Sequence, residues 1–165
     1  MIRYRPPAPK KSPYITPQGM ALLEAEQKAI WLKRREVVAA LSAAAAEGDR
    51  SENAEYIYRK KELRELDRRI RYLQKRLPDL KVVDKKPASS ERVYFGATVH
   101  LEDENDQEHI YRIVGPDEFD REEHFISMDS PLALALLKRE LGEEVKVEVP
   151  GGSYVYLITE ISYDV

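Results

Sequence analysis

The sequence predicts an α+β fold of two domains, an antiparallel helical hairpin followed by a small β-rich domain with one helix. Three features indicate this. Apolar residues recur every three or four positions through two long stretches before residue 80, which is typical of amphipathic helices. A short polar linker follows over residues 81–91 and contains Pro87 and two serines. After the linker, β-branched and aromatic residues are frequent, which favours strands.

The first helix is expected to begin at Thr16 and Pro17. Threonine is favoured at a helix N-cap, and proline suits the first helical position because an N–H there would lack a helical partner. Gly48 is a natural terminator. Between these limits, spacings of three and four define a heptad seam with two polar interruptions. The seam consists of Met20, Leu23, Gln27, Ile30, Arg34, Val37, Leu41 and Ala44.

A second seam follows the turn, and Pro78 should loosen or end its helix. Because only a few residues join the two seams, each can bury its apolar stripe only by folding back onto the other. We therefore expect a coiled-coil hairpin over residues 13–80. About 30 residues at 1.5 Å each give an arm roughly 45 Å long. The second seam consists of Leu63, Leu66, Ile70, Leu73, Leu77 and Leu80.

The C-terminal part is predicted to be a globular domain over residues 92–165. Its single helix falls in the segment "DSPLALALLKREL", where Ser130 is the expected N-cap and Pro131 the first helical residue. Residues 1–12, with two arginines and three prolines, are expected to form a disordered extension. The predicted strands cover residues 92–101, 109–114, 124–128, 144–149 and 153–165.

Composition narrows the class of protein. The chain has 165 residues, of which 42% are apolar and 35% charged, and it has no cysteine, which excludes disulfide scaffolds and cysteine zinc sites. No run approaches the roughly 18 apolar residues that span a bilayer, and the start lacks the apolar core of a secretory signal. We therefore expect a cytoplasmic protein without a membrane partner. No P-loop, GxGxxG or GxSxG motif is present.

Charge divides the chain in two. Residues 1–80 hold 18 Lys and Arg against 11 Asp and Glu, a net +7, whereas residues 81–165 hold 9 against 19, a net −10. The cations include a stripe on the second helix at spacings of three or four. Such a stripe can contact a phosphate backbone without reading sequence, or it can be a solvated helix flank. Its members are Lys60, Arg64, Arg68, Arg71 and Lys75.

The turn between the helices, "EGDRSENAEY", carries two carboxylates, Asp49 and Glu52. One interpretation is structural: Asp49 caps the second helix and Glu52 reaches back as in a capping box. The other is chemical, because two close carboxylates offer the hard oxygen ligands that suit Mg²⁺. Two ligands alone hold the ion weakly. The tip would therefore be half of a metal site that another macromolecule completes.

Several motifs together resemble those of the bacterial Gre transcript-cleavage factors, especially the B subtype. The resemblance covers roughly residues 11–163. Its most specific parts are the tip, "GDRSENAEY", and the helix after it, "KKELRELDRRIRYLQKRL". The match continues through "TPQGMALL", "RVYFGATV", "YRIVGPDEFD" and "ISMDSPLALALLKRELG".

The resemblance implies that the hairpin enters the secondary channel of RNA polymerase. There the carboxylates of Asp49 and Glu52 would help to hold the second Mg²⁺ and orient a water, so that the polymerase hydrolyses the 3′ end of backtracked RNA. Magnesium would be shared with the polymerase and not bound tightly by the free protein, which would itself be no enzyme. The resemblance also implies an FKBP-like fold for the C-terminal domain. It assigns polymerase anchoring to Asp129, Ser130 and Pro131, and RNA contacts to Lys60, Arg64, Arg68 and Arg71.

Two other hypotheses remain open at this point. A Gre-like regulator could occupy the same channel without promoting cleavage. A coiled-coil interaction module would have no link to the polymerase at all. In each case we expect a monomer.

Overall fold

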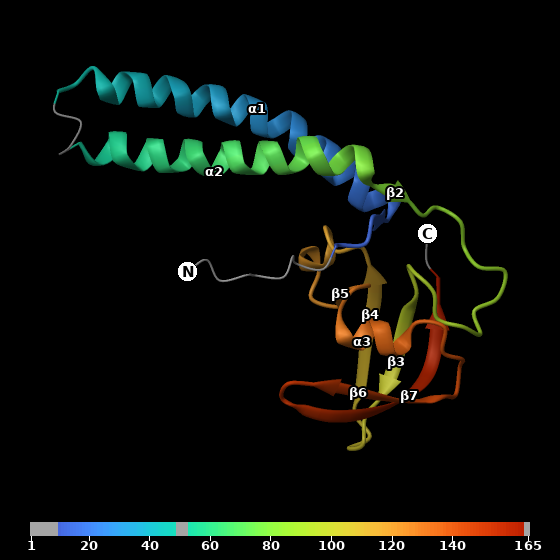
Figure 1. The fold of residues 1–165 in the computed structure, drawn as a ribbon. Helices are drawn as coiled ribbons and strands as arrows, with labels where there is room; N and C mark the ends of the chain where they lie inside the picture. Colours follow the sequence, from blue (N-terminus) through green and yellow to red (C-terminus); the bar gives the residue numbers. More distant parts are fainter. Residues whose placement is uncertain (1–9, 49–52, 164–165) are drawn as a thin grey trace, which may run out of the picture. The chain divides into compact units, whose positions relative to one another are not determined.

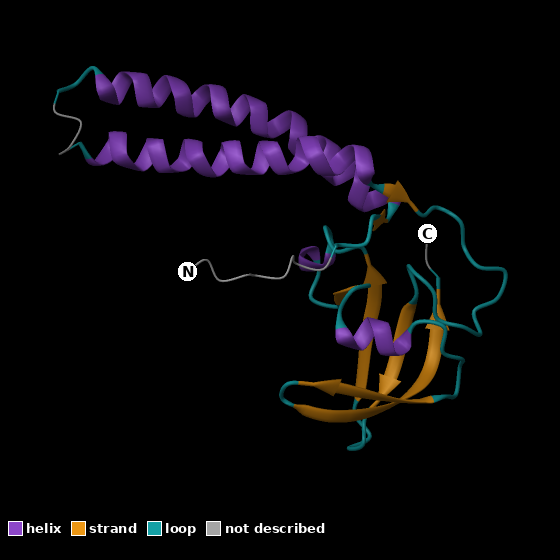
Figure 2. Ribbon diagram, in the orientation of Figure 1, coloured by secondary structure: helices purple, strands orange, loops and turns teal. Residues whose placement is uncertain are grey.

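The computed structural model describes residues 10–48 and 53–163. These residues form two compact units. One is Gln18–Leu80, and the other combines the described parts of Met1–Pro17 and Lys81–Val165. Helices followed by a β-rich domain with one helix confirm the predicted fold class (Figures 1 and 2).

The helical unit is an antiparallel hairpin of α1 (Pro17–Ala45) and α2 (Ala54–Arg76). Buried residues recur every seven positions along α1, as the heptad seam predicts. Glu26 of α1 pairs with Arg69 of α2, and Arg34, later in α1, pairs with Asp67, earlier in α2, which fixes the antiparallel direction. As expected from Pro78, α2 ends in a 3₁₀ turn, η1 (Leu77–Asp79). The buried hairpin side chains are Leu23, Ile30, Val37, Ala44, Ile70 and Leu73.

The globular unit is built on a five-stranded sheet in the order β5-β4-β3-β7-β6. Neighbouring strands are antiparallel except β4 and β5, which are parallel. The short helix α3 (Pro131–Leu136) packs on one face through Ala133 and Leu136, both fully buried (Figure 1). The strands are β3 (Thr98–Glu102), β4 (Glu108–Val114), β5 (Phe125–Ser127), β6 (Glu144–Val149) and β7 (Gly152–Ser162).

A second, two-stranded sheet was not predicted. Its strands β1 (Tyr14–Ile15) and β2 (Lys81–Val82) pair in parallel, with Tyr14 opposite Lys81 and Ile15 opposite Val82. β1 immediately precedes α1, and β2 follows η1, so the segments that enter and leave the hairpin are bonded to each other. Strands of two residues carry no periodic pattern, which is why sequence analysis cannot find them.

Two predicted elements are shorter in the structure. The C-terminal helix ends at Leu136, because Leu137 has an extended ψ of 134° and Lys138 has a φ of 70°. No glycine or proline marks that end in the sequence. The strand predicted over 92–101 begins only at Thr98; before it, Arg92 makes one isolated bridge to Glu140. Within the described ranges, no helix is long and apolar enough to cross a membrane.

Candidate functional site

The described residues on either side of the hairpin turn hold the two helix ends together through Asn53. Its side-chain oxygen accepts a hydrogen bond from Tyr56 N at 3.1 Å, so Asn53 is the N-cap of α2. Its amide nitrogen donates to the carbonyl oxygen of Ala44 in the last turn of α1, at 2.8 Å. The Ala44 carbonyl oxygen also accepts from Glu47 N at 3.2 Å. One side chain therefore bonds to a backbone group at each helix end. On the α1 side, Gly48 has a φ of 131°, which favours glycine.

Asp49 and Glu52 fall between these anchors and lie outside the described residues. The capping interpretation of Asp49 is nevertheless wrong, because α2 begins at Ala54 with Asn53 as its cap. Sequence analysis overlooked Asn53 although asparagine is among the best N-cap residues. With the cap assigned elsewhere, the helix no longer explains why the turn contains Asp49.

The first turns of α2 present aromatic and charged side chains. Arg59 bonds to Glu55 at 2.9 Å and to Glu62 at 3.0 Å. The hydrogen bond with Glu55, followed by that with Glu62, raises the pKa of the Arg59 guanidinium. Ile57 and Tyr58 are each more than half exposed, so aliphatic burial is weak here. The start of α2 therefore depends on local bonds more than on a packed seam.

The cations of the basic stripe are exposed on one face of α2, at i, i+4, i+8, i+11 and i+15 from Lys60. At 1.5 Å per residue, the span from Lys60 to Arg71 is roughly 16 Å. Lys60 lies over the ring of Tyr56, 5.9 Å from its centroid. Among the described residues, Arg64, Arg68 and Arg71 have no carboxylate partner. Their charge is therefore available to an external anion.

Other arginines of the hairpin are neutralised across it. Arg69 forms a bidentate pair with Glu26, with N···O distances of 2.7 and 2.8 Å. Arg34, a polar interruption of the predicted seam, bonds to Asp67 at 2.7 Å. Among the described residues, carboxylates pair with Arg59 and Arg69 of α2 but not with the arginines of the stripe, so the stripe is a distinct surface of this helix.

The predicted anchoring residues lie together where β5 leads into α3. Ser130 is the N-cap of α3, its hydroxyl accepting from Ala133 N at 3.3 Å, and Pro131 is the first helical residue. Both roles confirm the sequence prediction of the cap. Asp129 precedes them, is exposed, and donates its N–H to the Ser127 hydroxyl at 3.1 Å. We call residues 129–131 the anchoring loop.

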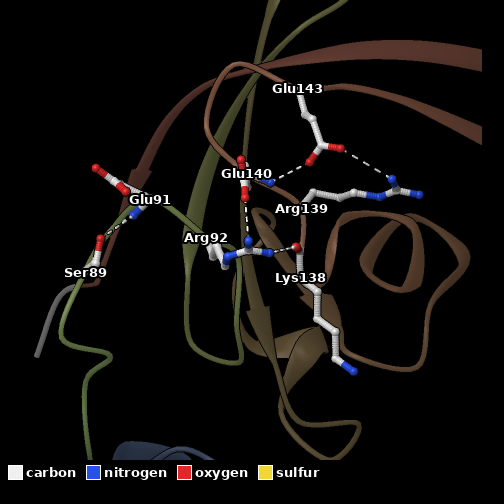
Figure 3. Close-up of polar contacts among 7 residues, drawn as sticks. All are labelled: Ser89, Glu91, Arg92, Lys138, Arg139, Glu140 and Glu143. Atoms are coloured by element: carbon white, nitrogen blue, oxygen red, sulfur yellow. Dashed lines mark hydrogen bonds and ion pairs between the residues drawn. The ribbon is translucent and has the colours of Figure 1, made fainter.

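A polar network fixes the chain beyond α3 (Figure 3). The Arg92 guanidinium bonds to the Glu140 carboxylate and donates to the Lys138 carbonyl oxygen. Glu143 accepts from Glu140 N at 2.6 Å and pairs with Arg139 at 3.5 Å. These residues line an open pocket of about 420 Å³ whose Glu140 and Glu143 are already paired with arginines. The network therefore accounts for the chain path after the short helix.

Metal ligands are sparse in the part of the chain that the structure describes, where no group of three His, Asp or Glu side chains could hold an ion. The histidines of β3 and β4 make pairwise bonds instead. His100 bonds to Glu108 and His109 to Asp103. The bond from His109 is the main cause of a lowered pKa for the Asp103 carboxyl, followed by the bond from the Gln107 amide.

Comparisons with known proteins identify the class. Residues 13–82 match the family described as "Transcription elongation factor, N-terminal", and residues 88–163 match "Transcription elongation factor, GreA/GreB, C-term". The chain belongs to the GreA/GreB family of transcription elongation factors.

Within that family, the similarity is to the GreB subtype. The chain is 56% identical to the transcription elongation factor GreB of Pseudomonas aeruginosa over 99% of this chain and 98% of the relative. It is 54% identical to GreB of Xanthomonas axonopodis pv. citri over the same shares. Among solved structures, Gfh1 of Thermus aquaticus aligns over 92% of this chain and 99% of that chain, at 21% identity and a TM-score of 0.43.

Proposed function

We propose that this chain inserts its hairpin into the secondary channel of RNA polymerase and stimulates magnesium-dependent cleavage of the 3′ end of backtracked RNA. The observation that carries the proposal is the tip. Asn53, and not Asp49, caps α2, so capping does not account for Asp49, and this supports the chemical interpretation of the turn carboxylates. Membership of the elongation factor family supports the choice of RNA polymerase as partner.

The proposed role of Asp49 and Glu52 is to offer carboxylate oxygens to an ion that the polymerase also binds. Mg²⁺ commonly takes one or two carboxylates together with water and phosphate oxygens, so this donor set fits it. In two-metal sites, a bound ion activates the attacking oxygen or stabilises the leaving one. In this proposal the chain supplies ligands and the polymerase performs the hydrolysis, so the chain acts as a stimulating factor.

The basic stripe has a separate part in the proposal. RNA that has backed out of the active centre is a single strand with one phosphate per nucleotide. Exposed Arg64, Arg68 and Arg71, which no carboxylate of the described residues neutralises, can hold such a strand by charge alone. Binding in this way is independent of sequence, as a factor that serves any transcript requires.

The test uses stalled, backtracked transcription complexes with labelled RNA at fixed Mg²⁺. Asp49→Asn and Glu52→Gln should each abolish stimulated cleavage, while polymerase affinity and thermal unfolding stay unchanged. Glu47→Gln is the matched control, because Glu47 is an exposed carboxylate next to the turn and should be dispensable. Full cleavage by both tip variants would contradict the metal-sharing role. Inhibition without cleavage by the unaltered chain would instead indicate a non-cleaving regulator of the same channel.

A further inference from the structure

Residues 12–16 form a strap along the globular unit, and its first residue bonds to the anchoring loop. Ser12 N donates to Asp129 Oδ2 at 2.9 Å, and the Ser12 hydroxyl donates to Asp129 Oδ1. Each oxygen of this exposed carboxyl group thus receives a hydrogen bond from the same residue, 117 positions away in sequence. The carboxyl group is therefore held in one orientation although it lies at the surface.

The other end of the strap is fixed by a buried acid, Glu118, which is only 1% exposed. Its Oε2 accepts from Thr16 N at 2.8 Å and from Gly115 N at 2.9 Å, and its Oε1 accepts from the Thr16 hydroxyl. Between the two ends, pairing with β2 adds hydrogen bonds, including one of 2.9 Å from Val83 N to Ile15 O. The strap therefore cannot shift without breaking several buried bonds.

Gly115 is required where the strap passes over it. A Cβ atom on Gly115 would lie 2.1 Å from the carbonyl oxygen of Tyr14, far inside contact distance. Because the obstacle is backbone, it cannot rotate away. Alanine at position 115 would therefore push the strap outward without removing any side chain that bonds to it.

We infer that Ser12 is a positioning residue that orients the Asp129 carboxyl group to receive a basic side chain of the docking partner. The inference rests on the proposed function, which assigns polymerase docking to the anchoring loop. A carboxylate has about four lone-pair sites, so two remain after Ser12 has donated. These can accept charge-assisted hydrogen bonds from a basic side chain. Since the group is already ordered before docking, less conformational entropy is lost on binding.

The effect of Ser12→Ala on polymerase affinity distinguishes positioning of Asp129 from blocking of it. If Ser12 merely occupied Asp129 and had to be displaced, removing its hydroxyl would strengthen docking. Ser12→Ala should instead weaken polymerase affinity by roughly two- to tenfold, the equivalent of ordering one side chain. The maximal cleavage rate at saturating factor should not change, because the tip is untouched. Ser89→Ala is the control, since the Ser89 hydroxyl also makes one local bond, to Glu91 N (Figure 3), and should leave affinity unchanged.

A double-mutant cycle separates positioning from a general structural effect. In an Asp129→Ala background, Ser12→Ala should cause no further loss, because the residue through which it acts is gone. Amide hydrogen exchange in the free protein provides a readout without polymerase: the Ser12 amide should be protected, and Asp129→Ala should abolish that protection. Unchanged or tighter binding by Ser12→Ala would overturn the inference, as would an equal loss in both backgrounds or an unprotected Ser12 amide.

Gly115→Ala is an independent variant, because it should displace the strap without changing Ser12 or Asp129. Gly115→Ala should lower polymerase affinity by at least as much as Ser12→Ala, whereas Gly151→Ala, with no atom within 4 Å of the added Cβ, should have no effect. Equal affinity of the two glycine variants would count against the strap. These measurements concern binding, so they stay distinct from the cleavage test. Whether or not loss of the tip carboxylates abolishes cleavage, the effect of Ser12→Ala on affinity should be the same.

Discussion

Replacing Glu118 with alanine should destabilise the globular unit by about 2 to 6 kcal/mol. The estimate follows from the two buried backbone N–H groups, of Thr16 and Gly115, that would lose their acceptor at about 1–3 kcal/mol each. Water that enters the vacated space would satisfy part of this demand, which favours the lower half of the range. A loss of this size is large for one substitution and is typical of breaking a buried hydrogen-bond network.

Glu118→Gln is the matched variant and should cost much less, under about 1 kcal/mol. Its amide oxygen can accept from the two N–H groups, and its amide NH₂ can donate to the Thr16 hydroxyl, which is able to accept as well as donate. Comparing the two substitutions therefore separates the hydrogen bonds from the negative charge and from the volume of the side chain.

Urea unfolding of the full chain can measure both variants. The single tryptophan, Trp31, lies in α1 and reports the hairpin, whereas near-ultraviolet circular dichroism of the many tyrosines after residue 90 reports mainly the globular unit. The tyrosine transition should move to lower urea in Glu118→Ala and stay nearly in place in Glu118→Gln. A change below about 0.5 kcal/mol in the alanine variant, the size of an ordinary surface substitution, would refute the reasoning.

Two further predictions concern charge. Arg68→Ala should weaken binding of short single-stranded RNA and reduce the slope of log affinity against log salt by about 0.7, the value for one phosphate contact. Arg69→Ala is the control and should change that slope less, because its guanidinium is paired with Glu26. Equal slopes for the two variants in anisotropy titrations would contradict a distinct stripe. Because His109 lowers the pKa of Asp103 in the folded chain, Asp103 contributes stability above its unfolded pKa, near 3.8, that is lost as pH falls through the lower folded value. In Asp103→Asn, the thermal unfolding midpoint should therefore fall less steeply below about pH 4 than in the unaltered chain. An unchanged pH dependence below pH 4 would show that other groups cause the loss of stability in acid.

The parts of the fold that sequence analysis predicted are those with local periodicity. Heptad spacing in α1 depends only on residues of that helix, and the turn at Pro78 depends on a single side chain. Most strand segments of the globular unit were predicted from β-branched and aromatic residues for the same reason, whereas their order in the sheet was not. The end of α3 was missed because Lys138 adopts a positive φ that its residue type does not predict.

The candidate site divides in the same way. The basic stripe was predicted because a helix converts spacing into a shared face. Which arginines of the hairpin are neutralised could not be predicted, since Glu26 and its partner Arg69 are 43 residues apart. The prediction named Asp49 as the cap and missed Asn53; residue type alone does not separate them, because aspartate and asparagine have nearly equal N-cap preferences.

The roles of Gly115 and Glu118 in the segment "GPDEFD" depend on residues that are far away in the sequence. Read alone, Gly115, Pro116 and Asp117 mark a turn after β4, and Glu118 has no evident role. In the structure, Gly115 and Glu118 both serve residues 14–16, about 100 positions earlier: the glycine leaves room for the Tyr14 carbonyl, and the acid accepts from Thr16. Because one residue supplies space and the other supplies acceptors, neither can replace the other. The strap should therefore be lost by Gly115→Ala even when Glu118 is intact.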